Sequence, residues 1–163
     1  MVIIIEGLDG TGKTTISKEL SKRYNFEYVK ESYTDDCKEK EYRMVLLLHR
    51  LLDSKIYIYD RATLIDDFVY SFLNQTTSTL TEYKNVIKAL LKKCILIHLQ
   101  LDEKTRSERF NERGDQYVTN DQINQIANNY KEFYSDLDDV NYINLTSDID
   151  KDIENIMEVI KND

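Results

Sequence analysis

The stretch from residue 2 to residue 20 constrains the fold more than any other part of the chain. Residues 2–5 are apolar and predict a short buried strand, residues 7–12 form a glycine-bearing turn, and a helix is predicted to open at Lys13 or Thr14. The turn fits the pattern G-x-x-x-x-G-K-[ST], the signature of a phosphate-binding loop. A strand, such a loop and a helix in this order indicate an α/β fold with an anion site at the end of the strand.

The spacing within the loop has a chemical reason. Gly7, Gly10 and Gly12 permit backbone conformations that a Cβ resists, so that successive N–H groups can surround a β-phosphate. Lys13 would then reach the β- and γ-phosphates, and the Thr14 hydroxyl would ligate Mg²⁺. A plain glycine turn with a solvated lysine is the alternative. The strand before the turn and the amphipathic helix after it favour the phosphate site.

The length of 163 residues suits one domain over residues 1–163. The composition is 41% hydrophobic and 32% charged, which is typical of a globular protein. We see no apolar run of the ~20 residues that span a bilayer and no leader, so we expect a cytoplasmic protein without a membrane partner. A formal charge of −8 argues against a nucleic-acid polymer as partner. With two cysteines and two histidines in unsuitable spacing, a zinc site is improbable.

Strands and helices are predicted to alternate along the chain. The remaining strands are expected over residues 26–29, 55–61, 94–102 and 141–145, and helices over residues 41–52, 64–73, 80–93, 103–113, 121–137 and 149–160. Residues 41–52 contain the run MVLLL and are predicted to form a buried helix. This alternation predicts a five-stranded parallel sheet between two helical layers, with any ligand at the carboxyl ends of the strands.

Two predicted strands end in aspartate, Asp60 and Asp102, and either could hold Mg²⁺ through water. We favour Asp60 because Arg61 follows it, and an acid beside a guanidinium suits metal and phosphate together. A local ion pair that caps the next helix is the alternative for this pair. Asp102 precedes a helix with Thr105 three residues on, which is typical of an N-cap.

The predicted helix 103–113 places Arg106, Arg109 and Arg113 on one face. Like charges at this spacing disfavour an isolated helix, and a polyanionic ligand would reverse the sign of that effect. Guanidinium groups stabilise the charge of a migrating phosphoryl group. A solvated face neutralised by neighbouring glutamates is the alternative reading.

Several further residues have weaker signals. Asp9 lies inside the loop and could face a sugar hydroxyl or a metal-bound water, or act as a turn former. Residues 144–148 join the last strand to the last helix, with Ser147 or Asp148 as a cap, and a base could rest against them. The second substrate could meet Lys30, Glu31, His49 and Arg50, and Tyr117, Tyr130 and Tyr134 could stack a base, although surface or core roles are more frequent for all of these.

With these residues assembled, the chain resembles the thymidylate kinase branch of the nucleoside monophosphate kinases. The segment EGLDGTGKTT, residues 6–15, is similar to the loop of that family, including Asp9. The segment IYDR, residues 58–61, resembles its DR motif, and residues 99–115 resemble its strand, helix and arginine-bearing lid. The resemblance implies a three-layer α/β/α P-loop NTPase fold, a lid around residues 103–119 and a homodimer.

The resemblance also implies roles for individual residues. ATP would contact Gly7, Asp9, Gly10, Thr11, Gly12, Lys13, Thr14, Thr15, Arg106 and Ser147, and Mg²⁺ would be held by Thr14 and Asp60. The acceptor would contact Asp9, Lys30, Glu31, His49, Arg50, Arg61 and Tyr70. Catalysis would depend on Lys13, Arg61, Arg109 and Arg113.

The expected activity is Mg²⁺-dependent transfer of the γ-phosphoryl group of ATP to a deoxynucleoside monophosphate, dTMP first. Asp66, Asp67 and Val69-Tyr70 stand where the family has a serine and a Tyr-Gln pair that reads thymine, so the base preference stays open. One alternative is a deoxynucleoside kinase with Glu6 or Glu31 as base near the 5′-hydroxyl. Another is a nucleotide-binding sensor without turnover. The short chain, rich in Lys, Asn and Tyr, suggests a phage-type variant.

Overall fold

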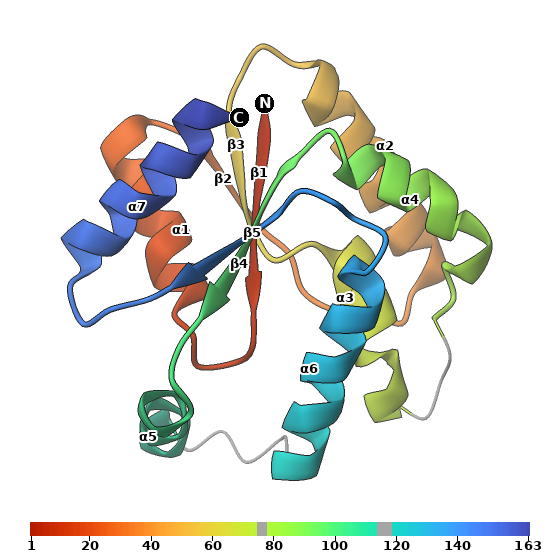
Figure 1. Cartoon of the computed structure of the whole chain (residues 1–163). Coiled ribbons are helices and arrows are strands. Elements are labelled where there is room, and N and C mark those ends of the chain that lie inside the picture. The colour runs from red at the N-terminus through yellow and green to blue at the C-terminus, as the bar shows by residue number, and fades with distance from the viewer. Residues whose placement is uncertain (75–77, 114–118) are drawn as a thin grey trace.

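The computed structural model describes residues 1–74, 78–113 and 119–163 and shows a parallel sheet with helices on both faces (Figure 1). The strands are β1 (Val2–Gly7), β2 (Glu27–Lys30), β3 (Tyr57–Asp60), β4 (Ile95–Gln100) and β5 (Val140–Asn144), in the order β2-β3-β1-β4-β5. All pairs between neighbouring strands are parallel, as predicted. The central strand β1 is buried along its whole length because helices cover both of its faces.

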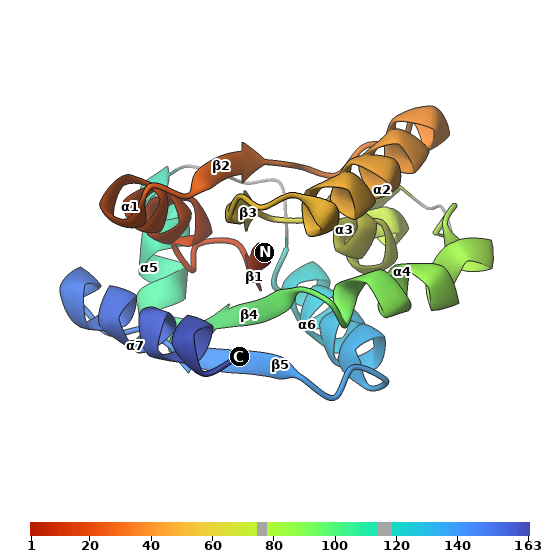
Figure 2. The same ribbon diagram turned by 90° about the horizontal axis from the view of Figure 1, so that it is seen from above.

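The helices are α1 (Lys13–Tyr24), α2 (Cys37–Leu52), α3 (Thr63–Tyr70), α4 (Lys84–Leu91), α5 (Glu103–Arg113), α6 (Asn120–Tyr134) and α7 (Ile149–Asn162), with short 3-10 turns at Ser71–Asn74 and Thr81–Tyr83. Helices α1 and α7 pack on one face of the sheet, against Ile3 and Ile5 of β1. Helices α2, α3, α4 and α6 pack on the other face, against Val2 and Ile4 (Figure 2). Helix α5 lies beyond the carboxyl ends of the strands (Figure 1).

Helix α2 differs from the prediction in its start and in its burial. It begins at Cys37 because Asp36 caps it, with the Asp36 side chain accepting hydrogen bonds from the backbone N–H groups of Lys38 and Glu39. The prediction of a buried helix was wrong, since Leu47 is buried while Val45 and Leu48 are exposed. Consecutive apolar residues point in different directions around a helix, so only one part of the run can face the sheet.

The strand register brings the predicted site residues to one edge. Asp60 ends β3 beside Ile5 of β1, and Gly7 ends β1 beside Leu99 of β4. A Cβ added at Gly7 would lie 2.6 Å from the Leu99 carbonyl oxygen, so only glycine fits where β1 turns into the loop. In the part of the chain that the structure describes, no helix is long and apolar enough to cross a membrane.

Candidate functional site

The loop after β1 is closed by its own lysine. The Lys13 ammonium is buried, donates hydrogen bonds to the carbonyls of Gly7 and Leu8 at 2.8 and 2.9 Å, and lies 3.6 Å from an Asp9 carboxylate oxygen. Burial, reinforced by the charge of Arg61, lowers the pKa of Lys13 to about 8. The cation is therefore held at the centre of the loop, where a phosphate would meet it.

The residues predicted to hold Mg²⁺ are in direct contact. The Thr14 hydroxyl donates to Asp60 Oδ2 at 2.6 Å, and the Tyr28 hydroxyl donates to the same oxygen at 2.9 Å. No cluster of three His, Cys, Asp or Glu side chains suited to a metal occurs among the described residues. Mg²⁺ in phosphoryl-transfer sites is held by one or two carboxylates together with substrate phosphates. Thr14 and Asp60 fit such an arrangement, which the substrate would complete.

The side chain of Arg61 extends from the end of β3 and contacts the loop after β1. Its guanidinium forms an ion pair with Asp9, lies 3.6 Å from Asp66 Oδ1 and stands over the ring of Tyr70 at 5.4 Å. Its backbone is in the left-handed region, with φ at 73°, which is uncommon and costly for a residue other than glycine. The Arg61 N–H donates to the Ile5 carbonyl, so the strained backbone is tied to the strand that carries the loop.

The arginines of α5 lie against the other side of the loop. A Cβ added at Gly10 would be 3.3 Å from the Arg106 carbonyl oxygen, and one added at Gly12 would be 3.7 Å from an Arg109 guanidinium nitrogen. Gly12 also has φ at 93°, so a side chain there would be strained by the backbone conformation, although the space around it is sufficient for a Cβ. The side chain of Arg113, and residues 114–118 of the expected lid, lie outside the described residues. Asp102 is the N-cap, accepting from the Thr105 N–H at 2.9 Å.

Two buried carboxyl groups lie below the loop. Glu6 accepts hydrogen bonds from the Ala62 N–H at 2.7 Å and the Tyr130 hydroxyl at 2.9 Å. Burial, with the charge of Asp66, raises the pKa of Glu6 to about 8. Burial also raises the pKa of Asp66 to about 6, and within the described residues neither Asp66 oxygen has a hydrogen bond. Sequence reasoning named Glu6 only as an alternative base, and Asp66 carried no signal beyond its departure from the family pattern.

The structure brings some of the predicted acceptor residues to the site and not others. Glu31 is buried at the end of β2, where it accepts from the Thr63 N–H at 2.9 Å, whereas Lys30 is exposed. His49 is exposed near the end of α2, and the Arg50 guanidinium lies over the rings of Tyr57 and Tyr59. Within the described residues, no contact joins His49 or Arg50 to the loop.

The remaining predicted contacts have simpler roles. The Thr11 hydroxyl donates to the Leu8 carbonyl at 2.8 Å and so closes the loop, while Thr15 is exposed on the first turn of α1. Ser147 is exposed, and Asp148 rather than Ser147 caps α7. Tyr130 and Tyr134 are buried and pack on each other, and Tyr117 lies outside the described residues.

The loop after β1 lies at the carboxyl edge of an all-parallel sheet, with Lys13 at its centre and with arginine side chains from the end of β3 and from α5 beside it. This arrangement defines a P-loop kinase domain. The comparisons agree and place the chain among the P-loop nucleotide and nucleoside kinases. Its family is the AAA domain family, whose model matches residues 3–135, so the chain belongs to that family.

Three proteins illustrate the similarity. The SPbeta prophage-derived uncharacterized protein YorR of Bacillus subtilis (strain 168) is 29% identical over 139 residues, 82% of either chain. The "Putative thymidylate kinase" of Acidianus bottle-shaped virus (isolate Italy/Pozzuoli) is 33% identical over 95 residues, 56% of this chain and 59% of that protein. A deoxyadenosine kinase from M. mycoides, solved with bound dCTP, is 25% identical with both chains covered fully and a TM-score of 0.62.

YorR has also been solved, in complex with phosphorylated GDP. That structure has a TM-score of 0.74 at 19% identity and covers 99% of this chain and 96% of its own, which is a likeness of fold.

Proposed function

We propose that the protein is an ATP-dependent kinase that transfers the γ-phosphoryl group to a deoxynucleoside monophosphate, with dTMP as the first candidate. The observation that carries the proposal is the contact between Arg61 and Asp9, which places a guanidinium from the end of β3 at the phosphate loop. A kinase of monophosphates must bring two anions together, and cations on both sides of the loop serve that purpose. The viral relative named as a thymidylate kinase supports dTMP.

Each residue has a distinct role in this proposal. Lys13 and the backbone amides of the loop bind the polyphosphate, and Arg61 binds the acceptor phosphate. Arg109, 3.7 Å from the position of a Gly12 Cβ, stabilises charge on the migrating group, and Arg113 is proposed to join it. Mg²⁺, when bound by Thr14 and Asp60 with the phosphates, would neutralise the β- and γ-oxygens.

The acceptor pocket is proposed to lie between the loop and α3. Asp9 and Arg61 face each other there, and the Tyr70 ring lies against the Arg61 guanidinium. Asp66 lies within 3.6 Å of the same guanidinium and has no hydrogen bond within the described residues. A carboxylate in this position accepts hydrogen bonds from a donor group of the acceptor substrate. The panel of acceptors described below determines which base supplies that donor group.

A deoxynucleoside kinase is the second candidate, and a specific observation favours it. Glu31 is a buried carboxyl group at the carboxyl end of β2, and the Thr63 N–H fixes its orientation. Burial raises the pKa of Glu31, which makes it a better proton acceptor than an ordinary glutamate once it is ionised. A base of this kind is needed near a 5′-hydroxyl. The similarity to the deoxyadenosine kinase over its full length points the same way.

The test is a panel of acceptors with ATP and Mg²⁺, read by ADP release. The four deoxynucleoside monophosphates and the four deoxynucleosides are each assayed with the unmodified protein, the Lys13→Ala variant and the matched control Lys18→Ala, whose lysine is exposed on α1. We expect turnover of a monophosphate that Lys13→Ala abolishes and Lys18→Ala retains.

The other outcomes separate the alternatives. Turnover of nucleosides alone would replace the proposal by the second candidate. ATP binding without ADP formation on any acceptor would indicate a nucleotide-binding sensor. Normal turnover by Lys13→Ala would contradict both kinase assignments.

A further inference from the structure

Glu6 is the last residue of β1 that has a side chain, and it is only 1% exposed. Its Oε1 accepts a hydrogen bond from the Ala62 N–H at 2.7 Å, and its Oε2 lies 2.9 Å from the Tyr130 hydroxyl, which donates to it. A buried carboxyl group is costly unless its oxygens have partners. Both oxygens of Glu6 have a partner within the protein, which favours a role toward Ala62 over the role of a base that acts on substrate.

The Ala62 N–H follows a strained residue. Arg61 has φ at 73°, in the left-handed region, which is uncommon for a residue other than glycine. The two peptide planes on either side of a Cα define its φ and ψ. The N–H of the plane before the Arg61 Cα donates to the Ile5 carbonyl at 3.1 Å, and the N–H of the plane after it donates to Glu6. Two successive residues of β1 therefore hold both planes and fix the conformation of Arg61.

Only one of these two hydrogen bonds depends on a side chain. The Ile5 carbonyl belongs to the backbone of the buried central strand, whereas the bond from Ala62 needs an accepting oxygen at the end of the Glu6 side chain. Ala62 is also the N-cap of α3, and its carbonyl accepts from the N–H groups of Ile65 and Asp66 at 2.9 Å. The Glu6 carboxyl group thus holds the point at which the chain leaves Arg61 and enters α3.

The backbone conformation of Arg61 decides where its guanidinium lies, because the direction of a side chain depends on the backbone that carries it. In the conformation observed, the guanidinium forms an ion pair with Asp9 and stands 5.4 Å over the ring of Tyr70. Backbone strain of this kind persists only where the surrounding structure holds it. An Arg61 that relaxed to an ordinary conformation would turn its side chain away from Asp9.

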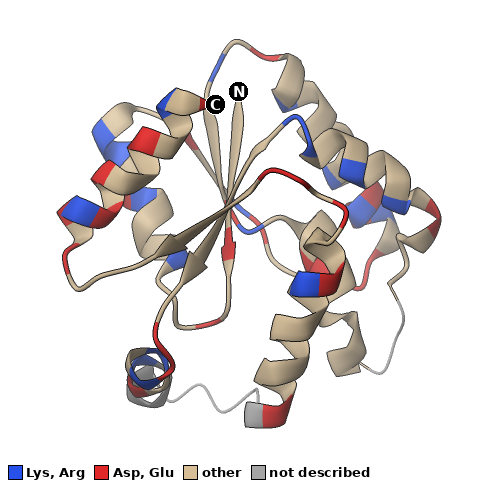
Figure 3. Cartoon of the chain, in the orientation of Figure 1, with Lys and Arg blue, Asp and Glu red and all other residues tan. Residues whose placement is uncertain are grey.

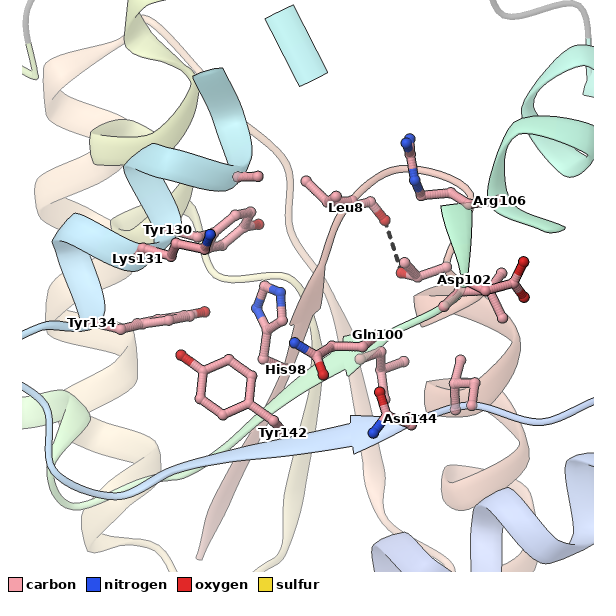
Figure 4. Close-up of a pocket in the computed structure, with 15 residues that line it drawn as sticks. Leu8, His98, Gln100, Asp102, Arg106, Tyr130, Lys131, Tyr134, Tyr142 and Asn144 are labelled. Carbon is pink, nitrogen blue, oxygen red and sulfur yellow. Dashed lines mark hydrogen bonds between the residues drawn. The ribbon is translucent and has the colours of Figure 1, made fainter. Parts of the chain in front are cut away.

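Tyr130 connects the same carboxyl group to α6. Its side chain lines a cavity of about 500 Å³, which Thr11 and Arg106 also line (Figure 4). Thr11 and Arg106 are contacts expected for ATP, so this cavity belongs to the donor side of the site. The Glu6 carboxyl group therefore bonds a wall of the donor cavity through one oxygen and the turn that carries Arg61 through the other.

We propose that Glu6 is a positioning residue for the acceptor phosphate, because its carboxyl group holds Arg61 in the left-handed conformation that brings the guanidinium to the phosphate loop. The proposal rests on the function proposed above, which assigns Arg61 to the acceptor phosphate. Glu6 itself touches no substrate. A replacement without an accepting oxygen should therefore weaken use of the acceptor and leave ATP binding intact, whereas glutamine, which keeps such an oxygen, should preserve both.

The first experiment compares the kinetics of three variants at pH 7, with ATP and the monophosphate that the acceptor panel identifies. Glu6→Met removes both oxygens at similar length, Glu6→Gln keeps one, and the control Lys88→Met removes a buried cationic side chain of α4. We expect kcat/KM for the acceptor to fall about 10- to 100-fold in Glu6→Met, since a small displacement of a positioning group has effects of this order. The KM for ATP should stay within about twofold in all three variants, and Glu6→Gln and Lys88→Met should retain kcat/KM within about threefold.

A double-mutant cycle separates action through Arg61 from general damage. Where Arg61 is already alanine, Glu6→Met should cause little further loss of kcat/KM, because the group that it positions is absent. Additive losses in the double variant would overturn the proposal. A rise in the KM for ATP equal to the loss with the acceptor would overturn it too.

Crystal structures of Glu6→Met and Glu6→Gln test the proposal without any turnover. We expect Arg61 to leave the left-handed region and separate from Asp9 in Glu6→Met, and to keep both features in Glu6→Gln. An Arg61 unchanged in Glu6→Met would overturn the proposal. If Glu6→Met does not fold, Glu6→Asp, too short to reach the Ala62 N–H, replaces it, and loss of folding in both variants would assign Glu6 to stability instead. Inactivity of the unmodified protein on every acceptor would contradict the proposed function alone, so either idea can fail separately.

Discussion

Replacing Glu6 by glutamine should remove a fall in stability between pH 6.5 and 8. Glu6 is buried below the loop, and burial with the charge of Asp66 raises its pKa from the ordinary 4.5 to about 8. In this range the folded protein holds a proton on Glu6 that the unfolded chain has released. The free energy of unfolding therefore falls as pH rises, because the unfolded state binds fewer protons.

The magnitude follows from the width of this range. One bound proton changes the free energy of unfolding by about 1.4 kcal/mol per pH unit, so the fall is about 2 kcal/mol from pH 6.5 to 8. Other buried groups act outside this window. The pKa of His98, lowered to about 4, makes stability rise with pH up to about 6.5, and Asp66, with its pKa raised to about 6, has ionised below the window. Lys13, with its pKa lowered to about 8, adds stability above it.

The assay is urea unfolding followed by circular dichroism at several pH values. Glutamine can still accept from the Ala62 N–H and contact the Tyr130 hydroxyl, so Glu6→Gln should fold. We expect its stability to be flat across the window, whereas the unmodified protein and the control Glu41→Gln lose about 2 kcal/mol, or about 4–8 °C in Tm. A flat profile for the unmodified protein, or an unchanged slope in Glu6→Gln, would refute the reasoning.

Two further predictions concern catalysis and packing. Arg109→Ala should lower kcat about 100-fold and change the KM for ATP much less, because removal of one hydrogen-bond donor to the transition state has this effect. The control Lys104→Ala, which removes an exposed lysine of the same helix, should change neither kcat nor KM. A change in KM alone would assign Arg109 to ATP binding. Lys40→Met should destabilise the protein by about 3–5 kcal/mol in thermal or urea unfolding, because it leaves Asp67 buried without its ion pair. The control Lys55→Met breaks an exposed ion pair and should cost at most about 1 kcal/mol. Equal losses of stability in the two variants would contradict the role of burial.

Local sequence patterns predicted those parts of the candidate site that lie within one segment of the chain or at the end of a strand. The loop, the helix that follows it and the Asp102 cap depend on residues close in sequence. The meeting of Thr14 with Asp60 could be predicted as well, because the carboxyl ends of parallel strands lie at one edge. The structure likewise places Arg109 beside the loop, as its spacing within a charged helix suggested.

The contacts that the sequence did not reveal join segments far apart. Tyr130 donates to Glu6 across 124 positions, and no periodicity links a strand residue to a helix residue at that separation. The same holds for Lys40, which pairs with Asp67 and the Thr79 hydroxyl in the interior although lysine is rarely buried. The apolar run of α2 led to the opposite error, because residues predicted to be buried are partly exposed. Hydrophobicity alone does not say which side of a helix meets the sheet.

The charge distribution explains how a chain with a formal charge of −8 can hold a site for anions. Both signs of charge are spread over the outer helices (Figure 3), while Lys13 and Arg61 gather at the loop. Such cations would repel each other in a partly buried site, and Asp9 lies between them, paired with Arg61 and 3.6 Å from Lys13. These cations lower the pKa of Asp9, although burial acts in the opposite direction, so this carboxylate stays ionised. A phosphate entering the loop would compete with a carboxylate already in place, which favours a dianionic or more highly charged ligand over a monoanion.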